Sequence, residues 1–362
     1  MRTNIQLNNL RSRLIGDQCE GILVSSELNQ RYISGFNYTD GYVLILQKKA
    51  YLLADFRYIE AARNTVCAED FDVVMPEGSM LSELALLCAT NGIKKLYTED
   101  ATLSCAMLER LRRAIEGVEI VGGASDAILA ERTVKMPWEL DKIAEAQSIT
   151  DKAFAHILDF IRPDMTEIEV ALELEFFMRR NGAEATAFET IAVSGRASSM
   201  PHGVPRNVKL EKGFLTMDFG AKVDGYCSDM TRTVVIGKAD DEMKRLYNTV
   251  LSAQNAALDI ICEGVECRRA DKVARDLIDN AGYRGCFGHS LGHGVGMFIH
   301  ESPRLYSGAS EDSKLGRGHV VTVEPGIYIA GKYGCRIEDM VAIDHNGKMI
   351  NFTKSPKELI EI

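Results

Sequence analysis

Apolar residues recur at two different spacings along the first 120 residues, and the alternation of those spacings predicts a mixed domain. Leu7, Leu10 and Leu14 repeat at the helical spacing. The segments with this helical pattern are 4–16, 57–64, 79–91 and 102–116. Short apolar runs between them predict strands over 21–25, 42–46, 50–55, 71–75 and 95–98. Strands that alternate with helices indicate an α/β domain. This region shows no cluster of catalytic residues. We therefore expect a domain that has a shaping or oligomerising role and takes no part in catalysis.

The alternation stops at 121–125, where the residues Val-Gly-Gly-Ala-Ser interrupt it. Pro137 follows at a position where proline is tolerated, the start of a long helix predicted from Trp138 to about Ile161. We therefore predict an N-terminal domain over 1–125, a linker over 126–137 and a second domain over 138–362.

The second domain contains an internal sequence repeat. The residues Leu-Asp-Phe-Ile at 158–161 are matched one hundred residues later by Leu-Asp-Ile-Ile at 258–261, and Gly182 is matched by Gly282. In each copy a second helix, about 166–180 or 266–280, is expected to end at that glycine. A length-matched helix–helix–strand order that occurs twice predicts a duplicated α+β domain, with sheet from both halves around one cleft.

Two carboxylates stand within strand-like runs at the centre of this domain. Asp218 lies in 216–220 and Asp229 lies in 226–232, with an Asp-Gly turn signal between the runs. Antiparallel pairing of the two runs places both carboxylates on one face, because side chains alternate along a strand. Buried carboxylates are costly unless a positive partner lies between them. That partner is either a basic side chain or a metal ion, and the metal is the sharper hypothesis.

Three later segments favour the metal. The first, 287–296, holds His289 and His293 among four glycines, which disfavour the helix of a zinc-binding histidine pair. In the second segment Glu324 ends an apolar strand. In the third, Arg336 and Glu338 are two residues apart, so we expect them to share a strand face. The candidate ligand set is therefore Asp218, Asp229, His293, Glu324 and Glu338.

The charge and donor types of this set indicate which metal it would hold. Its four carboxylates balance two divalent cations and not one, and two-metal hydrolytic sites activate a water between their ions. Oxygen donors with one imidazole favour Mn²⁺, and Co²⁺, Fe²⁺ and Zn²⁺ are the alternatives.

The composition of the chain limits its expected binding partners and cellular compartment. The formal net charge of −10 argues against a nucleic-acid partner. No apolar run reaches the roughly 18 residues of a membrane span, and residues 1–9 lack the apolar core of a signal peptide. The nine cysteines are scattered without a Cys-x-x-Cys pair, which is typical of a reducing compartment. We expect a cytoplasmic protein that binds neither nucleic acid nor membrane.

Five ordered motifs surround the candidate ligands, namely Met-Asp-Phe-Gly, Ser-Asp-Met-Thr-Arg, Gly-His-Gly-Val-Gly, Val-Glu-Pro-Gly and Arg-Ile-Glu-Asp. With them, residues 138–362 resemble the pita-bread metallopeptidases, and the N-terminal region resembles the creatinase-type domain of the Xaa-Pro enzymes. The resemblance implies an α+β protein in which a smaller α/β creatinase-like domain precedes a pita-bread catalytic domain. It also implies an Xaa-Pro aminopeptidase or Xaa-Pro dipeptidase, acting on proline-containing peptides or dipeptides as a homodimer.

The resemblance assigns a role to each candidate ligand. Asp229 and Glu338 would bridge two ions, Asp218 would bind one of them, and His293 with Glu324 would bind the other. Glu324 would also act as the general base that takes a proton from the bridging water and passes it to the proline nitrogen.

Other residues receive roles by the same resemblance. His202 resembles the substrate histidine ahead of the first aspartate, and His300 the histidine that contacts the scissile carbonyl and its developing oxyanion. His289 resembles the outer histidine of the cleft. Arg336 would pair with nearby carboxylates and fix their geometry, and Arg304 would meet a carboxylate of the substrate.

Two alternatives stand beside the peptidase hypothesis. One branch of the family keeps the fold but hydrolyses creatine without metal, as a creatinase-like amidinohydrolase. Other relatives are non-catalytic pita-bread binding or scaffold proteins. Both groups tend to lose the ligand set, whereas all five positions here carry coordinating side chains, so the sequence favours the metallopeptidase.

Overall fold

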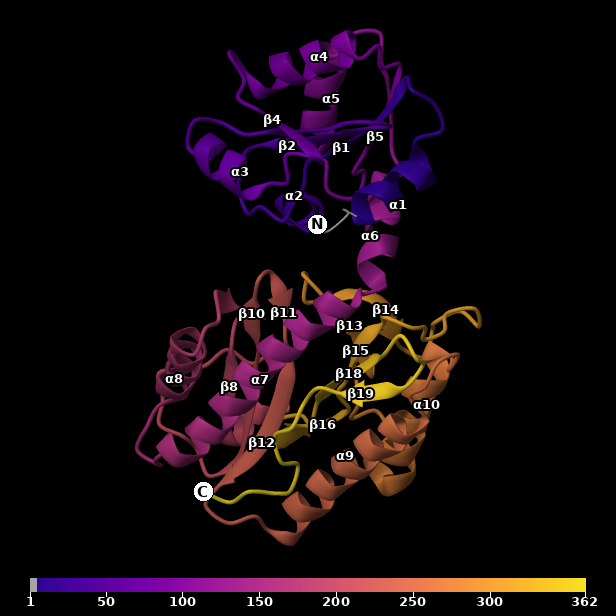
Figure 1. The fold of residues 1–362 in the computed structure, drawn as a ribbon. Helices are drawn as coiled ribbons and strands as arrows, with labels where there is room; N and C mark the ends of the chain where they lie inside the picture. The colour runs from indigo at the N-terminus through magenta and orange to yellow at the C-terminus, as the bar shows by residue number, and fades with distance from the viewer. Residues whose placement is uncertain (1–4) are drawn as a thin grey trace. The chain divides into compact units, whose positions relative to one another are not determined.

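The computed structural model describes residues 5–362, and the chain forms two compact units that divide between Arg132 and Thr133 (Figure 1). The helix predicted over 4–16 is present from Ile5 to Leu14. Residue 4 of that prediction, and the first four of the nine residues considered for a signal peptide, lie outside the described residues. Within 5–362, every helix is too short or too polar to cross a lipid bilayer.

The first unit is built on a six-stranded mixed sheet with the strand order β4-β3-β2-β1-β5-β6. Its strands are β1 Glu20–Val24, β2 Tyr42–Leu46, β3 Ala50–Leu53, β4 Phe71–Val74, β5 Lys95–Thr98 and β6 Glu119–Val121. Its helices are α1 Ile5–Leu14, α2 Glu27–Ser34, α3 Ile59–Thr65, α4 Met80–Thr90, α5 Cys105–Ala114 and α6 Ala124–Thr133. The central strand β1 pairs antiparallel with β2 and parallel with β5. The five predicted strands are therefore confirmed as members of one sheet.

Three elements of this unit escaped the sequence pattern, namely α2, β6 and α6. The buried face of α2 is partly polar, because Asn29 donates to Glu99 and Gln30 donates to the Gly41 carbonyl. Those two residues conceal the apolar repeat of the helix. Helix α6 runs through the segment predicted as a break and a linker. The domain limits of 1–125, 126–137 and 138–362 stay predictions.

The duplicated helix pair predicted for the second unit is present. Its members are α7 Pro137–Phe160 with α8 Glu167–Arg180, and α9 Asp241–Ile260 with α10 Cys267–Ile278. The first helix of each pair ends at 160 or 260, and the second begins at 167 or 267, so the two helix–helix junctions lie one hundred residues apart. Gly182 and Gly282 both have left-handed φ values, +108° and +97°, which are typical of helix C-terminal caps. In the second copy a π-helical turn over Asp279–Tyr283 follows α10, so α10 ends two residues earlier than predicted.

Short antiparallel sheets accompany the helix pairs. The main ones have the orders β12-β9-β8 and β14-β13-β15-β18-β19, and the smaller ones β11-β10-β7 and β16-β17. The strands of the first half are β7 Ala185–Thr186, β8 Ile191–Ser194, β9 Gly213–Phe219, β10 Ala221–Val223, β11 Tyr226–Cys227 and β12 Met230–Ile236. Those of the second half are β13 Gly292–Gly294, β14 Glu301–Leu305, β15 Val320–Val323, β16 Gly326–Ile329, β17 Tyr333–Arg336, β18 Asp339–Ile343 and β19 Met349–Asn351.

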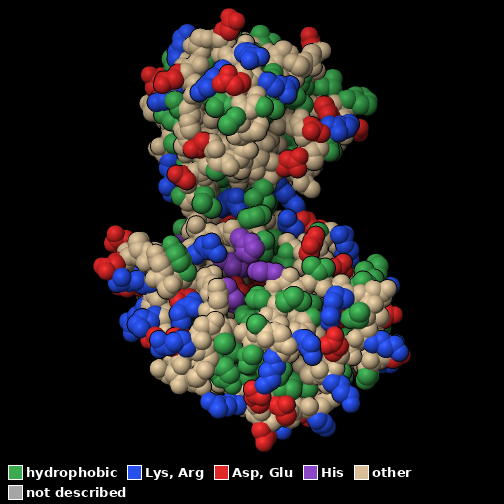
Figure 2. Space-filling view, turned by 180° about the vertical axis from the view of Figure 1, so that it is seen from behind, with side chains coloured by type: hydrophobic (Ala, Val, Ile, Leu, Met, Phe, Trp, Pro, Cys, Tyr) green, Lys and Arg blue, Asp and Glu red, His purple; other side chains and the backbone are tan. Residues whose placement is uncertain are grey.

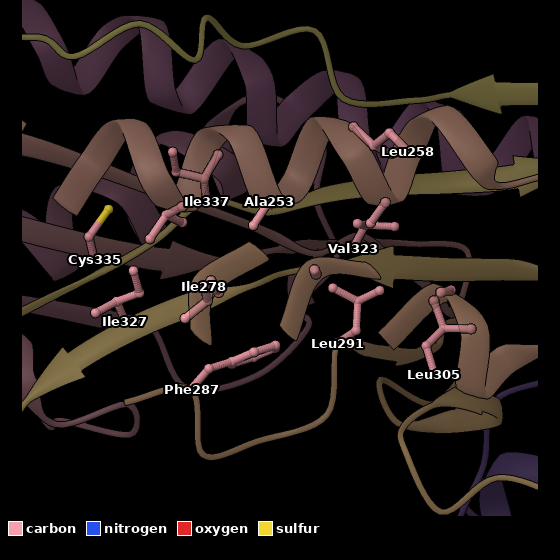
Figure 3. Close-up of a cluster of buried hydrophobic side chains, with 14 of the residues drawn as sticks. Ala253, Leu258, Ile278, Phe287, Leu291, Leu305, Val323, Ile327, Cys335 and Ile337 are labelled. Atoms are coloured by element: carbon pink, nitrogen blue, oxygen red, sulfur yellow. The ribbon is translucent and has the colours of Figure 1, made fainter. Parts of the chain in front are cut away.

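Each helix pair buries its apolar face against one of these sheets. Helices α7 and α8 pack on β9 and β12, with Met217 and Phe219 completely buried among them. Helices α9 and α10 pack on β15 and β18 together with β16 and β17, and Figure 3 shows Val323, Ile327, Leu291 and neighbouring side chains of this cluster facing one another. Burial of apolar area at about 25 cal/mol per Å² holds both layers in place. Because side chains alternate along β9, Asp218 points to the face opposite Met217 and Phe219.

Candidate metal centre

The predicted hairpin carries the first two candidate ligands. β9 pairs antiparallel with β12, and Asp218 lies opposite Thr231. β10 and β11 extend the ribbon to the turn at Asp224 and Gly225. Asp229 lies in the two-residue break between β11 and β12, directly before β12 begins at Met230. Both carboxylates line one cavity of about 900 Å³ in the second unit.

His293 enters this cavity from β13, the middle residue of a strand and not of a helix. Glycine is needed beside it, because a Cβ at Gly292 would lie 2.0 Å from the carbonyl oxygen of Thr322 on β15. The His293 Nε2 atom lies 3.3 Å from Glu324 Oε1 and 3.6 Å from Asp229 Oδ2. Its Nδ1 atom lies 3.1 Å from the Gly294 carbonyl oxygen, which turns Nε2 toward the carboxylates.

Glu324 and Glu338 each lie just outside a strand. Glu324 follows β15 directly, as predicted, and its Oε1 atom accepts a hydrogen bond of 3.0 Å from the Thr322 hydroxyl. The single strand expected around Arg336 and Glu338 is wrong, because β17 ends at Arg336 and β18 begins at Asp339. Glu338 lies in that break. It still faces the cavity, where its Oε2 atom accepts a 2.6 Å hydrogen bond from the Thr231 hydroxyl.

Arg336 supplies a buried positive charge beside these carboxylates. Its guanidinium donates to Asp218 Oδ2 at 2.6 Å, to the Thr231 hydroxyl at 2.9 Å and to the Tyr328 hydroxyl at 2.7 Å. Burial alone would lower the pKa of Arg336, but its anionic neighbours raise that pKa well above its usual value. This guanidinium forms an ion pair with Asp218, and within residues 5–362 no lysine or arginine forms one with Asp229, Glu324 or Glu338.

The donor set fits divalent cations. Asp229, His293 and Glu338 are 4%, 8% and 1% exposed, and their ligand atoms all lie within 4.8 Å of one another. Asp218 Oδ1 and Glu338 Oε1 are buried and have no hydrogen-bond partner in the described part of the chain, 5–362, which is costly for a carboxylate. Burial, together with repulsion among the carboxylates, raises the pKa of Asp229 and of Glu338 well above the usual range. Cations among these oxygens would remove both costs.

Three further histidines and an arginine line the same cavity, namely His202, His289, His300 and Arg304. Figure 2 shows histidine side chains gathered at a hollow in the surface of the second unit. Burial lowers the pKa of His289 to about 4, and its Nε2 atom lies 3.0 Å from the Tyr328 hydroxyl. Burial and the neighbouring His293 lower the pKa of His300. The structure thus brings every site residue predicted from the sequence into one cavity.

Three hydroxyl groups of this site, those of Thr231, Thr322 and Tyr328, were not predicted from the sequence. Thr322 and Thr231 each stand two residues from a predicted ligand, which is the spacing of neighbours on one face of a strand. The alternation that identified Asp218 and Asp229 could therefore have identified both threonines. Tyr328 bridges Arg336 and His289, and no signal in the sequence pointed to that contact.

The raised carboxyl pKa values predict how metal binding and pH act on stability. An acid whose folded pKa is raised costs stability above that pKa, and this cost disappears as the pH falls toward the unfolded value. Glu324, with a pKa raised to about 7 chiefly by burial, is one such group. The metal-free protein should therefore lose this penalty in acid, at up to about 1.4 kcal/mol per pH unit for each carboxylate.

Metal binding needs the ionised carboxylates and so weakens in acid. We expect the Tm difference between Mn²⁺-loaded and chelator-treated protein to be large at pH 7.5 and to shrink by pH 5.5. Groups that titrate equally in both forms cancel in this comparison. Thermal melts with and without Mn²⁺ across this range measure the difference, and a Tm difference that does not change with pH would contradict the expectation.

The sequence matches the models of two known protein families. A sequence model described as "Metallopeptidase family M24" matches residues 141–345, and one described as "Creatinase/Prolidase N-terminal domain" matches residues 6–134. An uncharacterized peptidase of Bacillus subtilis is 42% identical over 94% of this chain and 95% of its own length.

Two solved structures are similar over nearly the whole chain. The structure described as an Xaa-Pro dipeptidase from Bacillus anthracis has a TM-score of 0.93 and 42% identity, and the match covers 99% of each chain. The structure described as an X-Pro aminopeptidase from Thermotoga maritima has a TM-score of 0.89 and 36% identity, covering 95% of this chain and 98% of the other.

Proposed function

Because the chain belongs to metallopeptidase family M24, with a creatinase-type N-terminal domain ahead of a pita-bread domain, we propose that it hydrolyses the bond between a residue and the proline that follows it. The substrates would be dipeptides or the N-termini of longer peptides. One observation carries the proposal: buried carboxylates with unpartnered oxygens line a cavity that also holds His202, His289, His300 and Arg304. The cavity therefore combines carboxylates that can bind metal with side chains that can bind a peptide.

The residues that would hold the metal are Asp218, Asp229, His293, Glu324 and Glu338. Their four carboxylates suit two divalent cations, and oxygen donors with one imidazole favour Mn²⁺ over Co²⁺, Fe²⁺ or Zn²⁺. When bound, such ions polarise the scissile carbonyl and lower the pKa of a water molecule so that it can attack near neutral pH. Three of the four carboxylates are held by hydrogen bonds. Arg336 donates to Asp218. Thr322 donates to Glu324, and Thr231 donates to Glu338.

Glu324 is the proposed general base. The Thr322 hydroxyl donates to its Oε1 atom at 3.0 Å and holds the carboxylate at the cavity wall. Burial raises its pKa to about 7 in the metal-free protein; a bound cation would favour the ionised carboxylate, which is the form that can accept a proton. Glu324 would take a proton from the attacking water and deliver it to the nitrogen of the departing proline.

The remaining cavity groups would bind and orient the peptide. Because its pKa is lowered, His300 is neutral at pH 7, and one ring N–H can donate to the oxyanion that develops on the scissile carbonyl. His202 and His289 would contact the substrate from other sides. Arg304 lines the cavity and forms no ion pair among residues 5–362, so its charge can meet a substrate carboxylate.

A substrate panel tests the proposal. Protein supplied with Mn²⁺ should cleave Ala-Pro, and chelation should abolish that activity. Cleavage of Ala-Pro alone would assign a dipeptidase, whereas release of alanine from Ala-Pro-Ala and longer Xaa-Pro peptides would assign an aminopeptidase. Ala-Ala and Pro-Ala are matched controls. Stoichiometric metal binding without cleavage of any Xaa-Pro bond would overturn the proposal and favour a binding or scaffold protein.

The binding partners, cellular compartment and oligomeric state are proposed from the sequence. The net charge of −10 disfavours nucleic-acid partners. The scattered cysteines suit the cytoplasm, and the family resemblance implies a homodimer. Size-exclusion chromatography with light scattering would measure the oligomeric state directly.

A further inference from the structure

His202 lies in a segment that has almost no regular secondary structure. The segment 195–205 joins β8 to the approach of β9 and begins with a 3₁₀ turn over Gly195–Ser199. His202 is exposed, and its ring forms no hydrogen bond among the described residues. Its position in the cavity therefore depends on how the backbone of the segment is held.

One buried carboxylate holds both ends of that segment. Glu167, the first residue of α8, is completely buried. At one end its Oε1 atom accepts hydrogen bonds from the backbone N–H and the hydroxyl of Ser194, at 2.7 and 2.8 Å. At the other end its Oε2 atom accepts from the backbone N–H and Nε of Arg206, at 2.9 and 2.8 Å, while Arg206 Nη2 donates to Oε1 at 2.6 Å. The segment is thus closed into a loop by a bidentate pair.

The middle of the loop contacts the metal centre and forms part of the cavity wall. Arg336, which pairs with Asp218, also donates from Nη1 to the Pro201 carbonyl oxygen at 3.2 Å. The backbone N–H of Gly334 donates to the Ser198 hydroxyl at 3.0 Å. The loop residues that line the cavity are Pro201, His202, Gly203, Val204 and Pro205. A loop fixed at its two ends and at its middle holds His202 at one place beside the candidate ligands.

The second half of the duplicated domain uses a similar device. Asp271 on α10 is completely buried and accepts from Arg275 Nε and Nη2, each at 2.8 Å. The backbone N–H of Leu291 donates to Asp271 Oδ1 at 3.0 Å, and Arg275 Nη2 donates to the His289 carbonyl oxygen at 2.8 Å. In both halves, then, a buried carboxylate on the second helix anchors, with an arginine, the segment that carries a cavity histidine.

We propose that Glu167 is a positioning residue, which fixes the loop 195–205 through Ser194 and Arg206 and thereby sets the place of His202 in the cavity. This inference rests on the proposed peptidase function, in which His202 contacts the substrate. The hydrogen bonds to Glu167 outweigh the effect of its burial and keep its pKa below the usual value, so the carboxylate stays ionised. A small displacement of a substrate-orienting group is enough to slow catalysis substantially.

The direct test is Glu167→Gln in the full-length, Mn²⁺-loaded protein. Glutamine keeps the shape and one acceptor oxygen but offers the guanidinium an amide group in place of the second carboxylate oxygen. We expect kcat/KM for Ala-Pro to fall about tenfold, bound Mn²⁺ to stay unchanged, and hydrogen exchange in peptides covering 195–206 to accelerate. Arg206→Met is the second variant if Glu167→Gln fails to fold, because Arg206 is partly exposed.

A double-mutant cycle with His202→Ala separates positioning from general damage. If Glu167 acts through His202, Glu167→Gln should cost less than about twofold in the His202→Ala background. The same tenfold loss in both backgrounds, or unchanged exchange over 195–206, would overturn the inference. If the parent protein cleaves no Xaa-Pro bond, the proposed function fails, and the exchange measurement still decides whether Glu167 holds the loop.

Asp151→Asn is the matched control. Asp151 on α7 anchors another backbone segment of the same unit, accepting from the N–H groups of Lys354 and Ser355 and from the Ser355 hydroxyl. Its replacement removes an anchor of the same kind far along the chain from His202. We expect lower thermal stability with kcat/KM within about twofold of the parent.

Discussion

Replacement of Asp229 by asparagine should lower kcat/KM for Ala-Pro by at least about 10³-fold, because it would remove a charged ligand from the proposed metal centre. Asp229 is buried, and its Oδ2 atom lies 3.6 Å from His293 Nε2. Asparagine has the same shape but one weaker oxygen donor and no charge. Mn²⁺ bound per chain should therefore fall together with activity, and both are measurable on the same purified sample.

The same substitution should leave the metal-free fold intact or slightly stabilise it. Burial and three neighbouring carboxylates raise the pKa of Asp229 in the absence of cations, so a neutral side chain relieves repulsion. The Tm of chelator-treated D229N should then equal or exceed that of the chelator-treated parent, while the stabilisation by Mn²⁺ is lost.

Asp224→Asn offers a control within the same hairpin. Asp224 lies in the turn with a positive φ of 48° and its side chain is 66% exposed. Asparagine tolerates that left-handed conformation, and the position is outside the cavity. Activity and metal content should match the parent. A D229N protein that cleaves Ala-Pro at the parent rate would remove the basis for the metal centre.

The repeating patterns of the sequence predicted much of the fold. Strand alternation predicted that Asp218 and Asp229 share a face, and the Asp-Gly pair located the turn between them. The sequence repeat at an offset of one hundred residues predicted two helix pairs. In each case the information is local, because it depends on the spacing of residues within one element or one repeat.

Features set by contacts between distant segments were not predictable. One such feature is the break between β17 and β18 at Ile337 and Glu338. There the backbone carbonyl of Thr231, on β12, accepts from the Glu338 N–H, and the Thr231 hydroxyl donates to the Glu338 carboxylate. These two hydrogen bonds replace those of a continuous strand. The polar buried face of α2 depends on Glu99, seventy residues away. The five proposed ligands come from segments of both halves of the domain, so the sequence could name the residues but not the 3.3 Å approach of His293 to Glu324.

Replacement of Glu324 by glutamine should lower kcat for Ala-Pro by about 10³-fold with a much smaller change in KM, since general-base catalysis typically contributes 10²–10⁴-fold. Glutamine preserves the shape and can still accept from the Thr322 hydroxyl, but it cannot take a proton from the attacking water. Because Glu324 is also a proposed ligand, Mn²⁺ content must be measured at saturating metal, and kcat compared at equal occupancy.

Variants of Thr322 divide the two roles of Glu324. Thr322→Ser keeps the hydroxyl that donates to Glu324 Oε1 and to which the His293 N–H donates, so kcat should stay within about twofold of the parent. Thr322→Val removes that hydroxyl, frees the carboxylate to rotate and should lower kcat by about tenfold. If E324Q loses activity only in proportion to lost Mn²⁺, Glu324 is a ligand and not the base; if kcat falls at full occupancy, the proton transfer belongs to this carboxylate.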